Sequence, residues 1–410
     1  MSHDSVQPTA IPCEAARPAW RVMMLCCLIV FMAQMATTLY LPSLPIVMRE
    51  LAMSQSLVEM SISGFVVGAA LPVLFWGAAA DRWGRRGPLL ASLALFVLCS
   101  ALLAAVGSAV ELLFLRVLQG IAAGGAAIIA RIIVRDNWSG DELARRLSVL
   151  SIAFITALGA GQFIGGLIGQ YSHWQIGFVL MAVTGALAAL LSMTLPLQGG
   201  RQAAARQGGN PYWQILRRPG FVRPACAGGL GFATTITLQE ASPFVFQEHF
   251  GLAVASFGNV GLLIGVAYFL GAWTVNRTVS KLGGKKLMCA GALLIAAATA
   301  TASMLLCWHL GLLEARSGLL LFAGLYCLTI FGQAVLFPNS MAIAVSGTKN
   351  NGAHAMALCG FLQQGLAGIA ATVSVLLHHH GAWTLAVAAL GLATFLFCAG
   401  PTRGAQNDLD

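Results

Sequence analysis

The sequence contains twelve apolar runs, each about as long as the roughly 20 residues that a helix needs to cross a bilayer. Backbone polar groups that face lipid must be satisfied within their own segment, so each run is predicted to be a transmembrane α-helix. Only 9% of the residues are charged and 58% are hydrophobic, whereas a soluble protein has about 25% charged residues. The fold class is therefore an all-α membrane protein. The runs lie near residues 20–41, 57–79, 88–107, 111–131, 147–169, 174–195, 221–247, 257–276, 285–308, 317–337, 354–377 and 381–400.

The polar stretch at residues 196–220 divides the chain into two halves of six spans each. Glycines and arginines are frequent in it, which favours a loop. The first run lacks a clear small-residue cleavage site, so it is interpreted as a retained span and not as a secretory signal. The predicted organisation is a tail over 1–19, a first half over 20–195, a linker over 196–220, a second half over 221–400 and a tail over 401–410.

Positive charges are distributed unevenly between the two sets of loops. With the N-terminus in the cytoplasm, 20 of the 23 Lys and Arg residues lie on the cytoplasmic side, Arg49 and Arg316 lie outside, and Arg116 lies within a span. Cytoplasmic loops of membrane proteins carry such an excess. We therefore expect a multi-pass protein of a bacterial inner membrane, surrounded by the lipid bilayer, with both termini cytoplasmic. The net charge of +9 is not gathered on one soluble face, so no nucleic-acid partner is predicted.

A short charged loop joins the second and third runs. Residues 77–86 read Gly-Ala-Ala-Ala-Asp-Arg-Trp-Gly-Arg-Arg. Residues 271–286 repeat the arrangement, with a glycine at the helix end and a basic cluster beside a glycine turn. A duplicated six-span unit is typical of transporters that rock two halves about a central site.

The charged loop and three further patterns in the first half have the form of known family motifs. They are Gly77-x-x-x-Asp81-Arg82-x-Gly84-Arg85-Arg86, Leu115-Arg116-Val-Leu-Gln119-Gly120, Ala130-Arg131-Ile-Ile-Val-Arg135-Asp136 and Gln34-Met-Ala-Thr-Thr-Leu-Tyr40-Leu-Pro42. With these motifs the chain resembles the major facilitator superfamily, specifically its drug:proton antiporters of the Bcr/CflA type. The uncharged polar end of the first span is similar to that of the EmrD-like multidrug exporters. The resemblance covers essentially all of residues 20–400.

The resemblance implies twelve transmembrane helices in two pseudo-symmetric six-helix halves, and a transporter instead of an enzyme. It also implies a monomer that works by alternating access and exports small amphiphilic compounds in exchange for protons. The proton gradient then supplies the energy, and no cofactor is expected. One departure lies in the glycine-rich fifth span, Gly159-Ala-Gly161-Gln162-Phe-Ile-Gly165-Gly166, where Gln162 stands at a position that is usually proline. This departure bears on the antiport inference and not on the fold.

Two alternatives to multidrug export remain open. A dedicated exporter of an endogenous metabolite, such as a siderophore or a nucleoside, belongs to the same class of transporters. A cationic drug would favour an unpaired acid in the cavity, whereas an anionic or neutral metabolite would use Arg116 and the glutamines. A membrane-embedded enzyme or a receptor would belong to another class, but the sequence has no convergent Ser/His/Asp constellation. It also has no GxxxxGK[ST] nucleotide-binding motif.

Glu240 is the only one of the 14 acidic residues that lies well inside a predicted span. It follows Arg223 by about 25 Å of helix rise and thus lies in the outer half of the seventh span. Burial favours the uncharged form of a carboxyl group, and an adjacent cation favours the charged form. Such a group can couple proton release to the binding of a cationic substrate, so Glu240 is the predicted proton carrier. A hydrated acid near the outer mouth is the alternative.

Arg116 lies about one turn inside the outer end of the fourth span. A charge inside a span costs about 2.5–3.5 kcal/mol even on lenient scales, so its guanidinium is expected to face protein or water. Gln119 shares its helix face, whereas Glu111 is a poorly spaced candidate partner. The resemblance implies that Arg116 takes part in proton coupling or tunes a nearby carboxylate. An arginine that extends to the membrane surface is the alternative.

The charged loop is predicted to act as a gate. Its acid and arginines can bind helix carbonyl ends, or acids of a neighbouring loop such as Asp136 or Asp141. Such contacts would hold the cytoplasmic face closed while the outer face is open. Simple anchoring by positive charge is the alternative, and it leaves two glycines unexplained. The predicted gating residues are Gly77, Asp81, Arg82, Gly84, Arg85, Arg86, Arg131, Arg135 and Asp136.

Polar and aromatic residues within the spans are candidates for the substrate cavity, because apolar walls with a few polar groups suit amphiphilic molecules. Each one alone can equally be a packing residue, so the prediction concerns the set. No metal site is predicted, because the cysteines show no zinc-ligand spacing and the run at His378-His379-His380 would need further ligands. The cavity candidates are Gln34, Thr37, Thr38, Tyr40, Gln119, Phe154, Gln239, Phe244, Asn339, Gln363 and Gln364.

Overall fold

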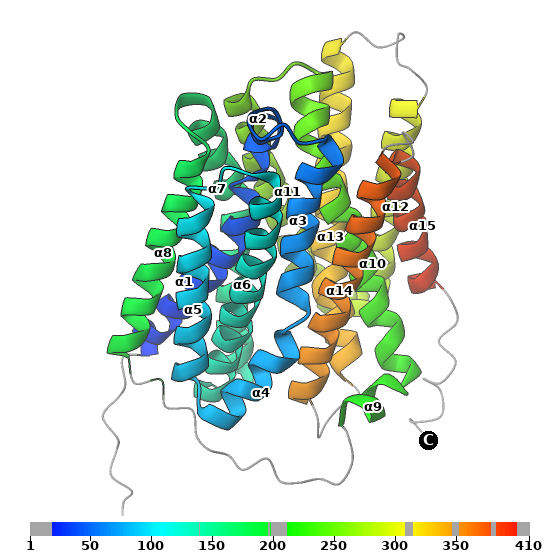
Figure 1. The fold of residues 1–410 in the computed structure, drawn as a ribbon. Coiled ribbons are helices and arrows are strands. Elements are labelled where there is room, and N and C mark those ends of the chain that lie inside the picture. Colours follow the sequence, from blue (N-terminus) through cyan, green and yellow to red (C-terminus); the bar gives the residue numbers. More distant parts are fainter. Residues whose placement is uncertain are drawn as a thin grey trace, which may run out of the picture.

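The computed structural model describes residues 19–138, 140–195, 197, 211–307, 315–346, 352–378 and 383–399, and the regular secondary structure of these residues is helical, with no strand. The long helices run side by side in one bundle (Figure 1). We call the top of this view the α2 end and the bottom the α9 end, after the short helices that lie there.

The helices of the two halves follow one another in chain order. The first half contains α1 Ala19–Thr38, η1 Leu41–Ser43, α2 Leu44–Glu50, α3 Gln55–Ala70, α4 Val73–Trp83, α5 Arg86–Leu103, α6 Ala109–Asn137, α7 Gly140–Tyr171 and α8 Gln175–Thr194. Of the predicted linker, residues 198–210 lie outside the described part and Pro211–Leu216 form α9. The second half contains α10 Pro219–Phe244, η2 Val245–His249, α11 Val254–Leu282, α12 Gly284–Cys307, α13 Ala315–Ser346, α14 Gly352–His378 and α15 Trp383–Ala399.

The structure confirms the fold of twelve membrane helices, because each predicted span coincides with a helix or a helix pair. Ten helical segments are long and apolar enough to cross a membrane, and α15 is apolar but shorter. The remaining span corresponds to α10, a 26-residue helix whose sequence includes Gln239 and Glu240. The least apolar span therefore carries the acid that the sequence singles out.

The second predicted span is not one helix. α3 ends at Ala70 and α4 begins at Val73, with Leu71 and Pro72 between them. Proline has no backbone N–H to donate to the preceding turn, and its ring clashes with a continuing helix. The expectation of a single helix over 57–79 is therefore corrected to two helices that meet at a break.

Helix pairs α7–α11 and α3–α14 pack the two halves together. In the first pair, a Cβ atom added at Gly166 would lie 2.7 Å from the Cα atom of Gly258. Glycines on the other side of α7 lie against α1, and a Cβ atom at Gly165 would lie 2.0 Å from the carbonyl oxygen of Leu39. Small residues permit such close approach of helix backbones. The glycine-rich fifth span thus contacts a neighbour on two faces, one of them in the opposite half.

The turns that follow α4 and α11 share one backbone geometry. Gly84 has a φ of 84° and Gly283 has a φ of 78°, in the region that glycine alone adopts readily. The two residues occupy equivalent places in the repeated sequences 77–86 and 271–286. Turn geometry therefore explains Gly84 without a gate. A Cβ atom at Gly77 would meet nothing within 4 Å, so no steric reason for that glycine is found.

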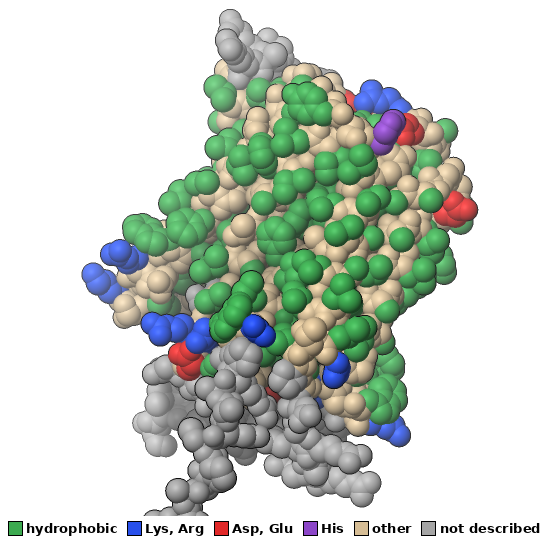
Figure 2. Space-filling model, turned by 90° about the vertical axis from the view of Figure 1, so that its left-hand side faces the viewer, with side chains coloured by type: hydrophobic (Ala, Val, Ile, Leu, Met, Phe, Trp, Pro, Cys, Tyr) green, Lys and Arg blue, Asp and Glu red, His purple; other side chains and the backbone are tan. Residues whose placement is uncertain are grey.

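Apolar side chains cover the sides of the bundle. Figure 2 shows one face with hydrophobic side chains over most of its height and Lys and Arg side chains gathered toward the α9 end. Leu71, Phe75 and Phe114 are examples of large apolar residues that are exposed. A soluble monomer rarely exposes apolar surface on this scale, so the surface fits a lipid environment.

Candidate functional site

Among the described residues, three charged side chains are buried with 2% or less of their surface exposed. Arg116 on α6 is 0% exposed, Glu59 on α3 is 1% exposed and Glu240 on α10 is 2% exposed. Charged residues are almost never fully buried unless they are paired. In a membrane helix they are functional candidates by default.

The guanidinium of Arg116 is enclosed by aromatic rings of the first half. Its Cζ atom lies 4.5 Å from the ring centre of Phe65, 5.1 Å from that of Tyr40 and 5.9 Å from that of Phe178. Aromatic faces attract a cation, and the attraction is strongest where water is excluded. The rings therefore compensate part of the cost of burying this charge.

Polar partners of Arg116 also come from the first half. Its Nη1 donates to the carbonyl oxygen of Ala36 at 3.0 Å and to Oε1 of Gln119 at 2.6 Å. Gln119 in turn donates to the hydroxyl of Ser100 at 2.8 Å. The Nε and Nη2 atoms of Arg116 have no hydrogen-bond partner. No carboxylate in the described part pairs with it, and Glu111 accepts a hydrogen bond from a backbone N–H four residues earlier.

The start of α6 sets the position of Arg116. The hydroxyl of Ser108 accepts a hydrogen bond from the backbone N–H of Glu111 at 3.3 Å, an arrangement that stabilises helix N-termini. Arg116 follows about two turns later, and Gln119 lies on the same face at i+3. The sequence predicts that Arg116 and Gln119 share a helix face, and in the structure the two side chains form a direct hydrogen bond.

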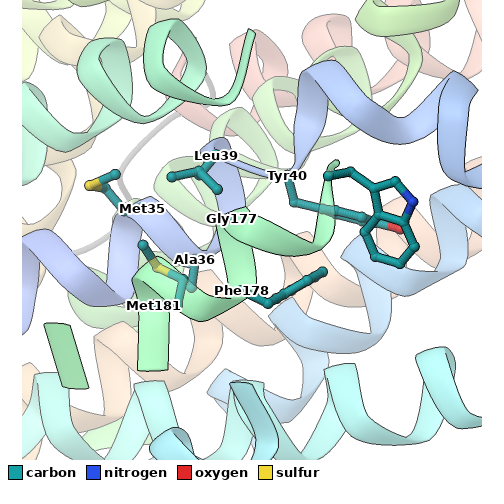
Figure 3. A pocket seen from close by; sticks show the side chains of 8 residues that line it. Met35, Ala36, Leu39, Tyr40, Gly177, Phe178 and Met181 are labelled. Carbon is teal, nitrogen blue, oxygen red and sulfur yellow. The ribbon is translucent and has the colours of Figure 1, made fainter. Parts of the chain in front are cut away.

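A small apolar pocket lies beside the rings, between α1 and α8. Its cavity volume is about 10 Å³, which is about the room that one water molecule needs. Figure 3 shows its methionines toward one end and Tyr40 and Phe178 toward the other. By size alone this pocket is not a cavity for a drug-sized compound. It is lined by Met35, Ala36, Leu39, Tyr40, Trp174, Gly177, Phe178 and Met181.

Glu240 lies where the two halves meet. Its Oε1 atom accepts a hydrogen bond from the hydroxyl of Ser63 on α3 at 2.8 Å. Its Oε2 atom is buried and has no hydrogen-bond partner. Within the described ranges, no Lys, Arg or His side chain forms an ion pair with it. The carboxyl group is therefore held by a hydroxyl of the opposite half and by no cation.

Other contacts join the halves at the α2 end. Gln247 on η2 donates to the carbonyl oxygen of Pro42 at 2.9 Å. Phe244, at the end of α10, is buried in an apolar cluster with Tyr40 and Leu41. The structure thus places Phe244, a predicted cavity residue, in the contact that closes this end.

Glu59 lies four residues before Ser63, on the same face of α3. Gln55 donates a hydrogen bond to its Oε1 atom at 2.9 Å. Because Ser63 donates to Glu240, the carboxyl groups of Glu59 and Glu240 both approach this face of α3. Glu59 stands at the start of the second predicted span, 57–79, and the sequence predicts no role for it.

Arg116 and Glu240 do not touch each other. Arg116 lies over the ring of Phe65, and Glu240 accepts from Ser63, so both meet α3 at nearby positions. No direct contact between the two side chains therefore supports the hypothesis that Arg116 affects the protonation of Glu240, and the hypothesis stays a prediction.

The predicted cavity residues of the first half serve mainly its own packing. Thr38 donates to the carbonyl oxygens of Ala157, at 3.0 Å, and Gln34, at 3.3 Å. Thr37 is buried and Gln34 is half-buried. Phe154 pairs with an aromatic ring of α11 at a centroid distance of 6.3 Å, and so contributes to the contact between the halves.

The predicted cavity residues of the second half are also dispersed. Asn339 donates to the carbonyl oxygen of Val335 at 2.7 Å. Gln363 donates to the hydroxyl of Ser340 at 3.2 Å, and its own Oε1 atom has no partner. Gln239 is buried on α10, beside Glu240 in the chain, and Gln364 is half-buried. The contacts of the set fall into separate groups, and its role as a cavity lining stays a prediction.

The arginines of the charged loop bind neighbouring helices of their own half. The Nε atom of Arg85 pairs with Asp136 on α6 at 2.7 Å. Arg86 donates to the carbonyl oxygen of Met193 in the last turn of α8. Arg135 also approaches Asp136, at 3.3 Å. These partners are a helix carbonyl end and the neighbouring acid, the two kinds that the sequence suggests.

A gate between the halves stays a prediction, because the contacts just described lie within the first half. Arg82 lies near the ring of Trp83, at 5.9 Å from its centre. Arg131 is exposed on α6. The side chains of Asp81 and Asp141 are outside the described part of the chain.

Gln162, the departure from the family pattern, lies at the contact between α7 and α11. Its side chain is 2% exposed, and its Nε2 atom has no hydrogen-bond partner. A Cβ atom added at Gly261 would lie 2.4 Å from the Cβ atom of Gln162. A glycine on α11 thus makes room for the glutamine, and the two helices stay in contact without a proline.

Sequence reasoning missed Ser63, Phe65 and the burial of Glu59. A signal existed for part of this group, because Gln55, Glu59 and Ser63 recur every four residues and form a polar stripe on an otherwise apolar helix. Phe65 carried no such signal, since aromatic residues are common in spans. No three His, Cys, Asp or Glu side chains in the described ranges lie close enough together to hold a metal ion, and His379 and His380 are not part of those ranges.

Comparisons with known proteins agree with this architecture. Residues 26–300 match the Major Facilitator Superfamily. The chain is 27% identical over 381 residues to the "Uncharacterized MFS-type transporter YdgK" of Bacillus subtilis, which covers 90% of this chain and 92% of that protein. It is 24% identical over 375 residues to "Multidrug resistance protein D" of Escherichia coli, with coverages of 89% and 91%. A crystal structure of a D-xylose-proton symporter matches the fold with a TM-score of 0.78 and 16% identity, over 94% of this chain and 99% of that chain.

Proposed function

This chain belongs to the major facilitator superfamily, and from that premise we propose that it exports small amphiphilic compounds in exchange for protons. The chain is a transporter and not an enzyme. Its relatives include proteins named "Multidrug resistance protein D" and "Bicyclomycin resistance protein homolog". The proposal extends drug export to this chain, with the proton gradient as the energy source in place of a cofactor.

The burial of Glu240 between the halves carries the proposal. Its carboxyl group is 2% exposed and accepts a hydrogen bond from Ser63 of the opposite half. Burial without a cation favours the uncharged form of a carboxyl group, and an amphiphilic cation beside it favours the carboxylate. A proton and a cationic compound therefore compete for one group, and this competition is the elementary step of antiport.

The same group couples protonation to movement of the halves. Burial of a neutral carboxyl group costs little free energy when the group is hydrogen-bonded, whereas burial of an unpaired carboxylate away from water costs much more. Protonated Glu240 therefore stabilises the closed α2 end, where Ser63 and Gln247 bond across the halves. Loss of the proton favours separation of these contacts. Alternating access then follows from rocking of the two halves about this junction.

The α9 end is proposed to face the cytoplasm of a bacterial cell, with the protein as a monomer in the inner membrane. The loop arginines Arg82, Arg85 and Arg86 and the lysines Lys285 and Lys286 lie in the turns at that end. Positive charge favours the cytoplasmic side of a membrane. The α2 end, with Glu240 nearer to it, then faces the outside and the source of protons.

Reconstitution into proteoliposomes tests the function. A pH gradient is imposed, and transport is measured for the lipophilic cations ethidium and tetraphenylphosphonium and for neutral nucleosides and anionic catecholates. We expect cation transport that requires the gradient and is lost in Glu240→Gln. Transport that persists after a protonophore has dissipated the gradient would rule out antiport. A response restricted to the nucleosides or catecholates would support a dedicated metabolite exporter instead.

A further inference from the structure

Glu59 is a second buried carboxyl group at the junction of the halves, and the function proposed above does not use it. We propose that Glu59 is a proton-transfer residue, through which protons reach Glu240 from the α2 end. The inference rests on the proposed antiport, because it assigns a route to the proton that antiport requires.

The three groups follow one another from the α2 end inward. Glu59 is one turn into α3, about 6 Å of helix rise before Ser63. The hydroxyl of Ser63 is 2.8 Å from Oε1 of Glu240. A carboxyl group, a hydroxyl and a second carboxyl group thus lead from the first half to the second.

The state of Glu240 points to a mobile proton at this place. Its Oε2 atom is buried and has no hydrogen-bond partner, although a buried polar atom of a carboxylate would need one. Glu59 is buried one helical turn from Ser63, the donor to Glu240, and a negative charge on one of two neighbouring buried carboxyl groups disfavours a second charge on the other. A proton shared by such a pair relieves both the burial and the repulsion.

The transfer step is balanced without any further reactant. Protonated Glu59 gives its proton to the oxygen of Ser63 while the hydroxyl proton of Ser63 passes to Glu240. One O–H bond breaks at Glu59, one forms at Glu240, and the negative charge moves from Glu240 to Glu59. After Glu240 has released its proton, rotation of the Ser63 hydroxyl turns its O–H bond back toward Glu240. Water at the α2 end then supplies the next proton to Glu59.

Other charged or titratable groups near this end are held by different partners. Arg49 donates to the carbonyl oxygen of Pro45, and Glu50 accepts from the indole of Trp174. Glu111 accepts from a backbone N–H. In the described part of α14, the imidazole of His354 packs against Tyr212 and the thiol of Cys359 is buried in a cluster with Ile215, both toward the α9 end. The groups on the elements that pack against α3 near Glu59 are Arg49 and Glu50 on α2, Glu111 and Arg116 on α6, Glu240 on α10 and, beside η1, Tyr40.

A pH-jump experiment on the full-length protein in lipid tests the inference without any substrate. Time-resolved infrared spectra record the carbonyl stretch of protonated carboxyl groups, and the band lost in Glu240→Gln identifies Glu240. We expect Glu59→Gln to slow protonation of Glu240 by about a hundredfold or more, since a positioned acid or base typically accelerates proton transfer by about 10²–10⁴-fold. Glu59→Asp keeps a carboxyl group and should restore much of the rate.

Glu111→Gln is the matched control, because it removes an exposed carboxyl group at the same end of the bundle. It should leave the rate unchanged. An unchanged rate in folded Glu59→Gln would overturn the inference. A slowed rate in both Glu59→Gln and Glu59→Asp would also overturn it, because a role in packing alone would then suffice.

The inference and the proposed function fail in different ways. If Glu59→Gln protonates Glu240 at the wild-type rate while the wild type exports tetraphenylphosphonium on a pH gradient, only the role of Glu59 is wrong. If the wild type exports no tested compound on a pH gradient, the antiport proposal is wrong, and the transport role of Glu59 is wrong with it.

Discussion

Arg116 and Glu240 are both buried inside membrane helices, but they are held in different ways. The ring and hydrogen-bond partners of Arg116 in the described part of the chain all belong to the first half: three aromatic rings, a backbone carbonyl and Gln119. Glu240 belongs to the second half and accepts its hydrogen bond from Ser63 of the first. Rocking of the halves would leave the contacts of Arg116 intact and would break that of Glu240.

The difference separates a group whose partners lie in its own half from a group whose hydrogen-bond partner lies in the other half. A charge whose partners move with it stays equally stable in every conformation of the transporter. A carboxyl group whose partner belongs to the other half gains or loses that partner as the conformation changes, and so its protonation can bias the conformation. The comparison therefore predicts that Arg116 contributes to stability and that Glu240 contributes to coupling.

Substitution of Glu240 should have the largest effect on transport. Glu240→Gln fixes the site in a neutral state, so pH-driven export falls to the protein-free background and exchange of tetraphenylphosphonium no longer depends on pH. Folding should be preserved, because the amide can still accept from Ser63. Transport in proteoliposomes at several pH values measures both effects. The matched control Glu248→Gln removes an exposed acid of η2 and should behave as the wild type.

Substitution of Arg116 should lower the stability of the protein and should not act on the coupling of protons to transport. Arg116→Ala leaves a cavity among the rings of Tyr40, Phe65 and Phe178, and truncation of a large buried side chain costs about 3 kcal/mol. Thermal unfolding is measured by the reaction of a thiol dye with buried cysteines such as Cys26. Arg116→Lys should also be less stable than the wild type, since an ammonium lacks the planar fork of donors. Wild-type stability in both variants would remove the contrast with Glu240.

The parts of the structure that the sequence predicted are those determined locally. Span positions follow from apolar runs, and Gly84 and Gly283 mark equivalent turns by residue type alone. The partner of Glu240 could not be predicted, because Ser63 lies 177 positions away in the chain and a serine in a span is a common packing residue. The break at Pro72 was accessible in principle, yet Pro224 and Pro243 lie inside α10 without ending it. The outcome at each proline depends on tertiary packing, which the sequence alone does not show.

Removal of the hydroxyl at Ser63 should produce a smaller, conformational effect. Ser63→Ala deletes one hydrogen bond between the halves, which is worth about 1 kcal/mol, or about a fivefold shift toward conformations with the α2 end open. Hydrogen exchange of the amides of α10 and η2 should rise accordingly. Ser61→Ala is the matched control, because Ser61 bonds only within the first half, to Val58 and Tyr40. Equal exchange in the two variants would contradict a role for the Ser63 bond in closure.

The smallest effect is expected at the charged loop, if its contacts stabilise the first half as those of Arg116 do. Asp136→Asn weakens the pair with Arg85, which is partly exposed and therefore worth less than about 1 kcal/mol. Faster hydrogen exchange around the turn at Gly84 should be the main result, with pH-driven export little changed. Glu142→Gln, which removes an exposed i,i+4 pair with Arg146, is the control for charge alone.

A large loss of export in Asp136→Asn, with stability retained, would group the loop with Glu240, as a contact that controls the conformation, and not with Arg116. The pair between Arg85 and Asp136 would then control the conformation, as the gate hypothesis requires, although both residues belong to one half. Such coupling needs the turn between α4 and α5 to shift when the halves rock. The break at Pro72 permits that shift, because α4 is separated there from α3, which contacts the second half through Ser63.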